Sequence, residues 1–244
     1  MVEIQKNKLN VAKYVLTVAI ILGLIVVFFI IYKYQIQGEA VPPFRISKMV
    51  VVSTVKTDNL QLEEGTYNAN LIQNNDVKIA IEKNSEYKKE AIIRKITINN
   101  IQIDKKNTQG NIEIYRPVDG IYKYEENYKI NDSIEYEGAQ ETYVSEENVQ
   151  ISNQGGIIDL AVIVKDLGKV QYKDNEAVKV DGTLLKSIGV EDIGFEVNFD
   201  LIIELQSNVK LKTKITLNLP AGDILENGVQ TIEEENLHTV FKRI

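Results

Sequence analysis

The sequence predicts an all-β domain, an antiparallel β-sandwich of jelly-roll or immunoglobulin-like type, that follows one N-terminal transmembrane α-helix. Three observations support this prediction. A long uncharged apolar run lies near the N-terminus, the rest of the chain alternates apolar and polar residues in many short segments, and turn-forming residues separate those segments. After the run, the only helical structure we expect is one short turn at 184–192.

The apolar run at residues 15–31 reads VLTVAIILGLIVVFFII and contains no charge. It approaches the about 20 residues that cross a hydrocarbon layer, and a helix satisfies all its own backbone groups in lipid. Side chains suited to the two membrane interfaces flank the run. These predicted interface anchors are Lys13, Tyr14, Tyr32 and Lys33. The sequence therefore predicts a transmembrane helix over residues 14–34.

Two other interpretations of this run are weaker. A cleaved signal peptide has an apolar core of roughly 7–15 residues before a small-x-small site, which the following YKYQIQGEAVPP lacks. A buried core helix would rarely be apolar on all sides between lysines. The compact lysines ahead of the run favour a cytoplasmic N-terminus and an extracytoplasmic domain at the cell membrane. Because basic residues also follow the run in almost equal number, the reverse orientation stays open.

The prediction divides the chain into a cytoplasmic arm at 1–13, the helix at 14–34, a stalk at 35–43 and a β-sandwich domain at 44–244. Pro42 and Pro43 end any helix, so the chain is expected to leave the membrane extended. The acidic, tyrosine-rich stretch at 120–150 would be the seam if the domain were two small sandwiches. We favour a single sandwich.

The clearest strand pair lies at 195–205 and 209–219, where apolar residues alternate strictly with polar ones. The polar residues 206–208 between them predict a β-hairpin turn. Further strands are expected at 45–55, 76–82, 92–103, 111–115 and 157–165. Within 92–103 the apolar parity changes, which indicates a β-bulge at Asn99-Asn100.

Turn-forming residues recur between these segments. They are Asn74-Asn75-Asp76, Asp119-Gly120, Gln154-Gly155-Gly156 and Asp181-Gly182, and the Pro-Gly sequence at 219–222 is expected to end the hairpin. Together with the short strands, this punctuation favours a sandwich over a helical fold.

Composition excludes several functions. The 244-residue chain has no Cys, one His and a net charge of −7. Four of the 28 basic and one of the 35 acidic residues lie in the first 33 positions, which leaves −10 on the remainder. Such a charge disfavours nucleic-acid binding. With His238 as the only histidine and no nucleophile motif, we expect neither catalytic residues nor a metal or cofactor.

Tyrosines concentrate in one acidic stretch, where they form the candidate ligand-binding residues. These are Tyr115, Tyr122, Tyr124, Tyr128, Tyr136 and Tyr143. Their rings could stack on sugars or dock a peptide, and the neighbouring carboxylates could bind sugar hydroxyls or Ca²⁺. The alternative is that they are ordinary strand tyrosines in a solubilising acidic region.

The chain resembles bitopic, β-rich envelope proteins of low-GC Gram-positive bacteria. The resemblance rests on the apolar run and on VPPFRISKMVVVST, DGTLLK, FDLIIEL and the terminal VFKRI. It implies an envelope location and carries no motif of known chemistry, so no functional residue transfers from it.

The expected function is that of a non-catalytic interaction or structural protein of the bacterial envelope. Its expected partners are the lipid bilayer and either another envelope protein or a second copy. The alternatives are a cell-wall glycan-binding module that uses the tyrosines and a carboxylate-dependent hydrolase, which needs two acidic side chains facing each other in a cleft.

Overall fold

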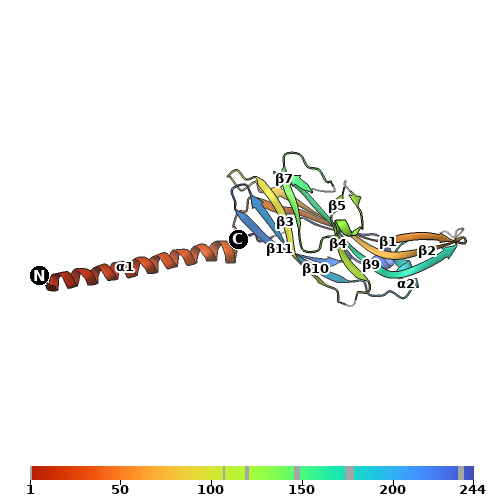
Figure 1. Cartoon of the computed structure of the whole chain (residues 1–244), viewed down its shortest axis with the longest axis horizontal. Coiled ribbons are helices and arrows are strands. Elements are labelled where there is room, and N and C mark those ends of the chain that lie inside the picture. Colours follow the sequence, from red (N-terminus) through yellow and green to blue (C-terminus); the bar gives the residue numbers. More distant parts are fainter. Residues whose placement is uncertain (1, 107, 119–120, 146–148, 174–178, 236–238) are drawn as a thin grey trace.

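In the computed structural model, a long helix projects from one end of an elongated β domain (Figure 1). The structure describes the chain except residues 1, 107, 119–120, 146–148, 174–178 and 236–238, and it also leaves the side chains of 2–12, 58–61, 63 and 227 undescribed. The predicted turn at Asp119-Gly120 and His238 therefore lie outside the described residues.

The N-terminal helix α1 (Val2–Ile31) continues as a single π-helical segment, Tyr32–Gln37. Its apolar part, Lys13–Gln37, has no residue buried against the rest of the protein. The helical structure thus extends three residues beyond the predicted end at 34. It stops at Gly38, which has a φ of 92°, a conformation that glycine adopts without a steric penalty.

One sheet of the domain contains the longest strands. Within the described residues its five strands have the order β12-β1-β2-β9-β4. They are β12 (Gln230–Glu235), β1 (Phe44–Glu63), β2 (Thr66–Lys83), β9 (Gly155–Lys173) and β4 (Asn111–Tyr115). The hairpin of β1 and β2, with β9 beside it, reaches the end of the domain far from α1 (Figure 1).

The described strands of the second sheet have the order β13-β11-β10-β3-β7-β8. They are β13 (Lys242–Arg243), β11 (Lys210–Leu219), β10 (Phe195–Leu205), β3 (Ile93–Asp104), β7 (Ile134–Ala139) and β8 (Gln150–Ser152). The β7–β8 pair is parallel. The purely antiparallel sandwich expected from the sequence is therefore wrong in this detail, because β8 runs in the same direction as β7.

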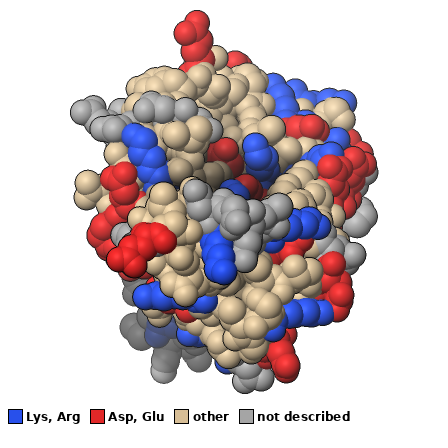
Figure 2. All heavy atoms as spheres, turned by 90° about the vertical axis from the view of Figure 1, so that its right-hand side faces the viewer, with Lys and Arg blue, Asp and Glu red and all other residues tan. Residues whose placement is uncertain are grey.

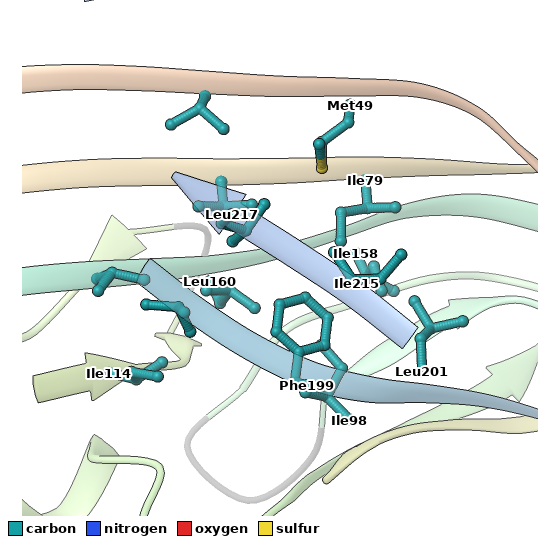
Figure 3. Packing of buried hydrophobic residues seen from close by; sticks show 14 of the residues in the cluster. Met49, Ile79, Ile98, Ile114, Ile158, Leu160, Phe199, Leu201, Ile215 and Leu217 are labelled. Atoms are coloured by element: carbon teal, nitrogen blue, oxygen red, sulfur yellow. The ribbon is translucent and has the colours of Figure 1, made fainter. Parts of the chain in front are cut away.

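The two sheets pack face to face over one large apolar core (Figure 3). Met49, Ile79 and Ile158 from the first sheet meet Phe199 and Ile215 from the second. Along β11 buried residues alternate with exposed or half-buried ones, so one face of this strand faces the core and the other faces outward. Shorter elements complete the domain: β5 (Pro117–Val118), β6 (Ile121–Tyr122), a 3₁₀ turn (Glu126–Tyr128), α2 (Gly182–Ser187) and α3 (Ile224–Asn227).

The C-terminal hairpin is confirmed. β10 pairs antiparallel with β11 from Phe195↔Leu219 to Glu204↔Lys210. The predicted bulge of β3 is also present, since the pairing with β10 passes from Asp200↔Asn99 directly to Asn198↔Gln102. The expected helical turn at 184–192 begins earlier, at Gly182, where Asp181 caps α2 by accepting a hydrogen bond from the Thr183 N–H.

The turn predicted at Asn74-Asn75-Asp76 is wrong, because these residues lie in the middle of β2. Asn75 is fully buried inside the sandwich, where its amide donates to Val162 O at 2.9 Å and its carbonyl oxygen accepts from Ser53 Oγ at 2.6 Å. Ser53 Oγ in turn accepts the N–H of Ala221 at 2.8 Å. Buried polar groups with such partners are tolerated in a strand, so the polar run did not indicate a turn.

The C-terminus packs against the exit of the helix (Figure 1). The Glu39 N–H donates to Phe241 O at 2.6 Å, and Phe241 is 1% exposed. Gly38 is buried there, because a Cβ on it would lie 2.4 Å from Val240 Cγ1. The predicted free stalk at 35–43 is thus shortened to a joint that the last residues of the chain hold against the domain.

Candidate functional site

The six candidate tyrosines do not form one exposed row. Tyr115, Tyr128 and Tyr136 are buried, Tyr122 and Tyr124 are half-buried, and Tyr143 is 49% exposed. Buried rings cannot stack on a sugar at the surface, so the structure separates the six into two places: the outer face of the first sheet and a groove beside β8.

Four of the tyrosines belong to a small second core on the outer face of the first sheet. Tyr115, Tyr122, Tyr124 and Tyr128 pack there with Val118 over Ile72, Ala161 and Ile163. The segment after β4 crosses this face and covers it. The Tyr124 hydroxyl donates to Asn74 Oδ1 at 2.7 Å, and Asn74 is fully buried. These rings therefore fasten the covering segment to the sheet.

An ionic cluster lies at the edge of this cover. Lys129 Nζ and Lys165 Nζ lie 2.8 Å and 2.9 Å from the Glu113 carboxylate, and the Tyr115 hydroxyl donates to it at 2.5 Å. Burial alone would raise the pKa of Glu113, but these hydrogen bonds outweigh burial and lower it to about 2. The carboxylate is fully paired, which indicates a structural rather than a ligand-binding role.

The remaining two tyrosines, Tyr136 and Tyr143, line a groove of about 780 Å³ between the two sheets. Its walls come from β7, β8, the residues 142–144 and the first part of β9. Ile157, on β9, is 61% exposed beside it. Tyr143 and Ile157 thus present apolar surface next to a concave site, the usual setting for ligand or peptide recognition.

Asp159 provides the charge of the groove, and no other ionisable acid is among its described lining residues. Burial raises the pKa of this carboxyl, Asp76 adds to the rise, and Lys78 and the residue's own N–H oppose it. The backbone oxygen of Asp159 accepts a hydrogen bond from the Tyr136 hydroxyl at 2.6 Å. A cationic group entering the groove would compensate the desolvation of this carboxylate.

Behind Asp159, the covering segment leaves polar atoms without partners among the described residues. The Tyr122 hydroxyl and Asp76 Oδ1 are both buried and make no hydrogen bond there. Burial first, and the carboxylates of Asp159 and Asp76 second, raise the pKa of Tyr122, so its phenol stays protonated.

Sequence reasoning did not select Asp159 or Ile157. The available signal was a single acid inside the apolar stretch IIDLAVIV, since a charged residue in a strand of this kind requires a partner or a function. No group of three or more His, Cys, Asp or Glu that could hold a metal is found among the described residues.

The end of the domain opposite the helix carries acidic and basic side chains interspersed with uncharged surface (Figure 2). Neither positive nor negative charge predominates on that face, so its charge distribution does not indicate a binding site for an anionic or a cationic ligand.

The fold and the groove define a mostly β protein, in which two packed sheets follow an exposed apolar N-terminal helix that could be a signal anchor or a signal sequence. No protein-family model, curated protein or solved structure matches this chain.

Proposed function

We propose that this protein is a non-catalytic, membrane-anchored interaction protein of the bacterial envelope, with a cytoplasmic N-terminus and an extracytoplasmic sandwich. The observation that carries the proposal is the exposed helix joined to the domain by the C-terminus. The large apolar side chains of 15–31 are 43% to 65% exposed, and burying such surface in lipid stabilises the helix by about 25 cal/mol per Å². The described 25-residue span is about 37 Å long, enough to cross a bilayer.

The joint supports an interaction role because it limits the freedom of the domain. A flexible stalk would let the sandwich sample many orientations, whereas Glu39, Phe241 and Arg243 connect the helix exit to the second sheet. The domain then presents its groove at a restricted angle to the membrane. We also propose that the sandwich is of the immunoglobulin-like or jelly-roll type, as the sequence suggested.

Anchoring and orientation can be tested in cells that express the full chain with a tag at each end. We expect the protein to resist alkaline extraction from membranes, and external protease to remove only the C-terminal tag. A soluble product that lacks about its first forty residues would contradict the anchor, and loss of only the N-terminal tag would reverse the orientation.

The interaction role is tested by photo-crosslinking in intact cells from exposed residues at separate positions. Suitable sites are Ile103, Ile121, Ile157 and Val229, which are 39%, 59%, 61% and 60% exposed. We expect at least one site to give an adduct with an envelope protein or with a second copy of the chain. If no site gives a protein adduct, the proposed function is wrong.

Glycan binding is the second candidate. Tyr143 is the tyrosine best placed for it, because its ring is exposed beside Gln150 and Ser152 whereas other candidate tyrosines are buried. It predicts that Tyr143→Ala reduces co-sedimentation with purified cell wall, while a Tyr172→Ala control does not. A carboxylate hydrolase is the weakest candidate: Asp76 lies near Asp159, but its Oδ1 is buried and Asp76 is not among the described lining residues of the groove.

A further inference from the structure

The first part of β9 has an open edge. β2 pairs with β9 over almost its whole length, from Glu82↔Gly155 to Thr66↔Lys173. On the other side, β4 pairs only with residues 161–165. Among the described residues, no strand is hydrogen-bonded to 155–160 on that side, and this stretch borders the groove. Alternate backbone groups of an edge strand point sideways and can pair with another strand. In this stretch the Asp159 carbonyl oxygen already accepts the Tyr136 hydroxyl at 2.6 Å, so pairing there uses its second lone pair.

The reason for the open edge lies in the sequence after β4. β4 ends at Tyr115, which is opposite Ala161, and the next pairing along β9 would require residues 116 and 117. Pro117 has no N–H to donate, and the Arg116 N–H donates instead to Tyr128 O at 3.0 Å. The chain therefore turns across the outer face, and no described strand continues the pairing of β4 along β9 beyond Ala161.

The groove beside this edge has the features of a strand-binding site. Ile157 and Asp159 occupy alternate positions of β9, and Tyr143 lines the same groove. Gly156 lets β9 and β8 approach closely at the floor of the groove, because a Cβ there would lie only 3.1 Å from Ile151 Cγ1. Peptides that extend a sheet gain affinity from main-chain hydrogen bonds and specificity from alternate side chains.

Charge indicates the chemistry of the occupant. Asp159 is the acid of the groove, and the chain after its first 33 residues carries a net charge of −10, because 24 of its residues are basic and 34 are acidic. A second copy would bring an equally acidic domain to this site, whereas a basic segment would be attracted to it.

We propose that an extended, basic segment of a partner protein adds to β9 along 155–160, in line with β4, with a Lys or Arg side chain against Asp159. This inference rests on the proposed interaction role and names the surface and the partner chemistry for it.

The test uses the full chain in lipid nanodiscs and a fluorescein-labelled peptide in which Val and Thr alternate with Lys. Three peptides are compared by fluorescence anisotropy: the Lys peptide, the same peptide with Glu for Lys, and the Lys peptide N-methylated along its backbone. N-methylation keeps the charge and side chains but removes the hydrogen-bond donors. We expect both altered peptides to bind roughly tenfold more weakly or worse, as loss of main-chain or charge-assisted hydrogen bonds predicts.

Variants locate the site. We expect Asp159→Asn and Ile157→Lys each to weaken binding of the Lys peptide roughly tenfold. Val229→Lys places the same charge at a residue of nearly equal exposure, 60% against 61%, and should leave the affinity unchanged. Hydrogen exchange supplies a readout independent of affinity, since backbone amides in 156–160 should exchange more slowly when the Lys peptide is bound.

Three results would each overturn the inference. The first is equal affinity of the Lys peptide and its N-methylated form, and the second is an equal effect of Ile157→Lys and Val229→Lys on peptide affinity. The third is a dimer of the wild-type chain that Ile157→Lys dissociates, which would make a second copy the occupant. If these results appear while crosslinking from Ile103, Ile121 or Val229 still captures an envelope protein, the strand-addition site is wrong and the interaction role stands.

Discussion

Glu39, at the exit of the N-terminal helix, and Arg243, next to the last residue, form an ion pair with 3.0 Å between Oε1 and Nη2. The Arg243 guanidinium also lies 4.6 Å from the centre of the Tyr34 ring, a cation–π contact. The two ends of the folded domain are therefore fastened to each other and to the helix. This contact leads to two predictions about the joint.

Gly38→Ala should displace the C-terminal strand from the helix exit. The added Cβ would lie 2.4 Å from Val240 Cγ1 and 2.9 Å from Phe241 O, at a φ of 92°, so we expect a loss of about 1–3 kcal/mol in the free energy of unfolding. Faster hydrogen exchange of the amides at 241–243 would report the displacement. Gly23→Ala is the matched control, because a Cβ there meets nothing within 4 Å; equal exchange in both variants would contradict the packing described.

Arg243→Gln should loosen the joint and cost about 1–3 kcal/mol of stability. The Arg243 side chain is 41% exposed but that of Glu39 only 12%, so the substitution leaves a largely buried carboxylate without its cation. We expect the distance distribution between spin labels at Ile36 and Ile103 to broaden in nanodiscs. Arg45→Gln removes a more distant ion pair, with Glu82 at 3.7 Å, and should leave the distribution unchanged. An unaltered distribution in Arg243→Gln would show that Phe241 alone holds the joint.

Ser53→Ala should destabilise the sandwich more than its size suggests. It removes the acceptor of the Ala221 N–H and a donor to Asn75 inside the core, and leaving buried polar groups unpaired costs about 1–3 kcal/mol. Chemical denaturation measures the loss. Ser47→Ala, which removes one long hydrogen bond of 3.4 Å to Ala80 O, should cost less than about 0.5 kcal/mol. Equal losses would mean that the interior network contributes nothing specific.

The Glu113 cluster predicts a pH dependence of stability. Because the folded pKa of Glu113 is lowered from 4.5 to about 2, its contribution is complete above pH 4.5 and disappears as the pH falls towards 2. Glu113→Gln should be less stable than the wild type at pH 7, by about 2–3 kcal/mol at most, and the difference should shrink between pH 5 and 2. Glu141→Gln alters an exposed acid and should show no such convergence. A constant difference across this range would refute the role of the charge.

Patterns of period two were sufficient for much of the fold. The alternation in 195–219 predicted β10, β11 and their turn, and the change of parity at Asn99-Asn100 predicted the bulge in β3. The alternation and the change of parity each depend only on the order of residues along one strand, and this order can be read directly from the sequence. Strands β7, β8 and β12 were not predicted, because they are short or polar and owe their structure to the strands beside them.

Polar residues in strands misled the prediction for a related reason. The stretch at 74–76 has the composition of a turn, but Ser53 and Val162 supply hydrogen-bond partners for Asn75 that lie far away in the sequence. Likewise, the tyrosine-rich stretch suggested an exposed binding strip, and half of its rings are buried. Whether a tyrosine is core or surface depends on which segment covers it, a property of the packed structure.

The sequence by itself determined the apolar helix, the β character of the domain and the alternating faces of its clearest strands, because hydrophobicity and periodicity act locally. Only the tertiary structure decided where β9 has no paired strand among the described residues and which residues hold the C-terminus to the helix. Those features depend on contacts between residues up to 204 positions apart, and such contacts form only when the two sheets pack and the chain ends meet.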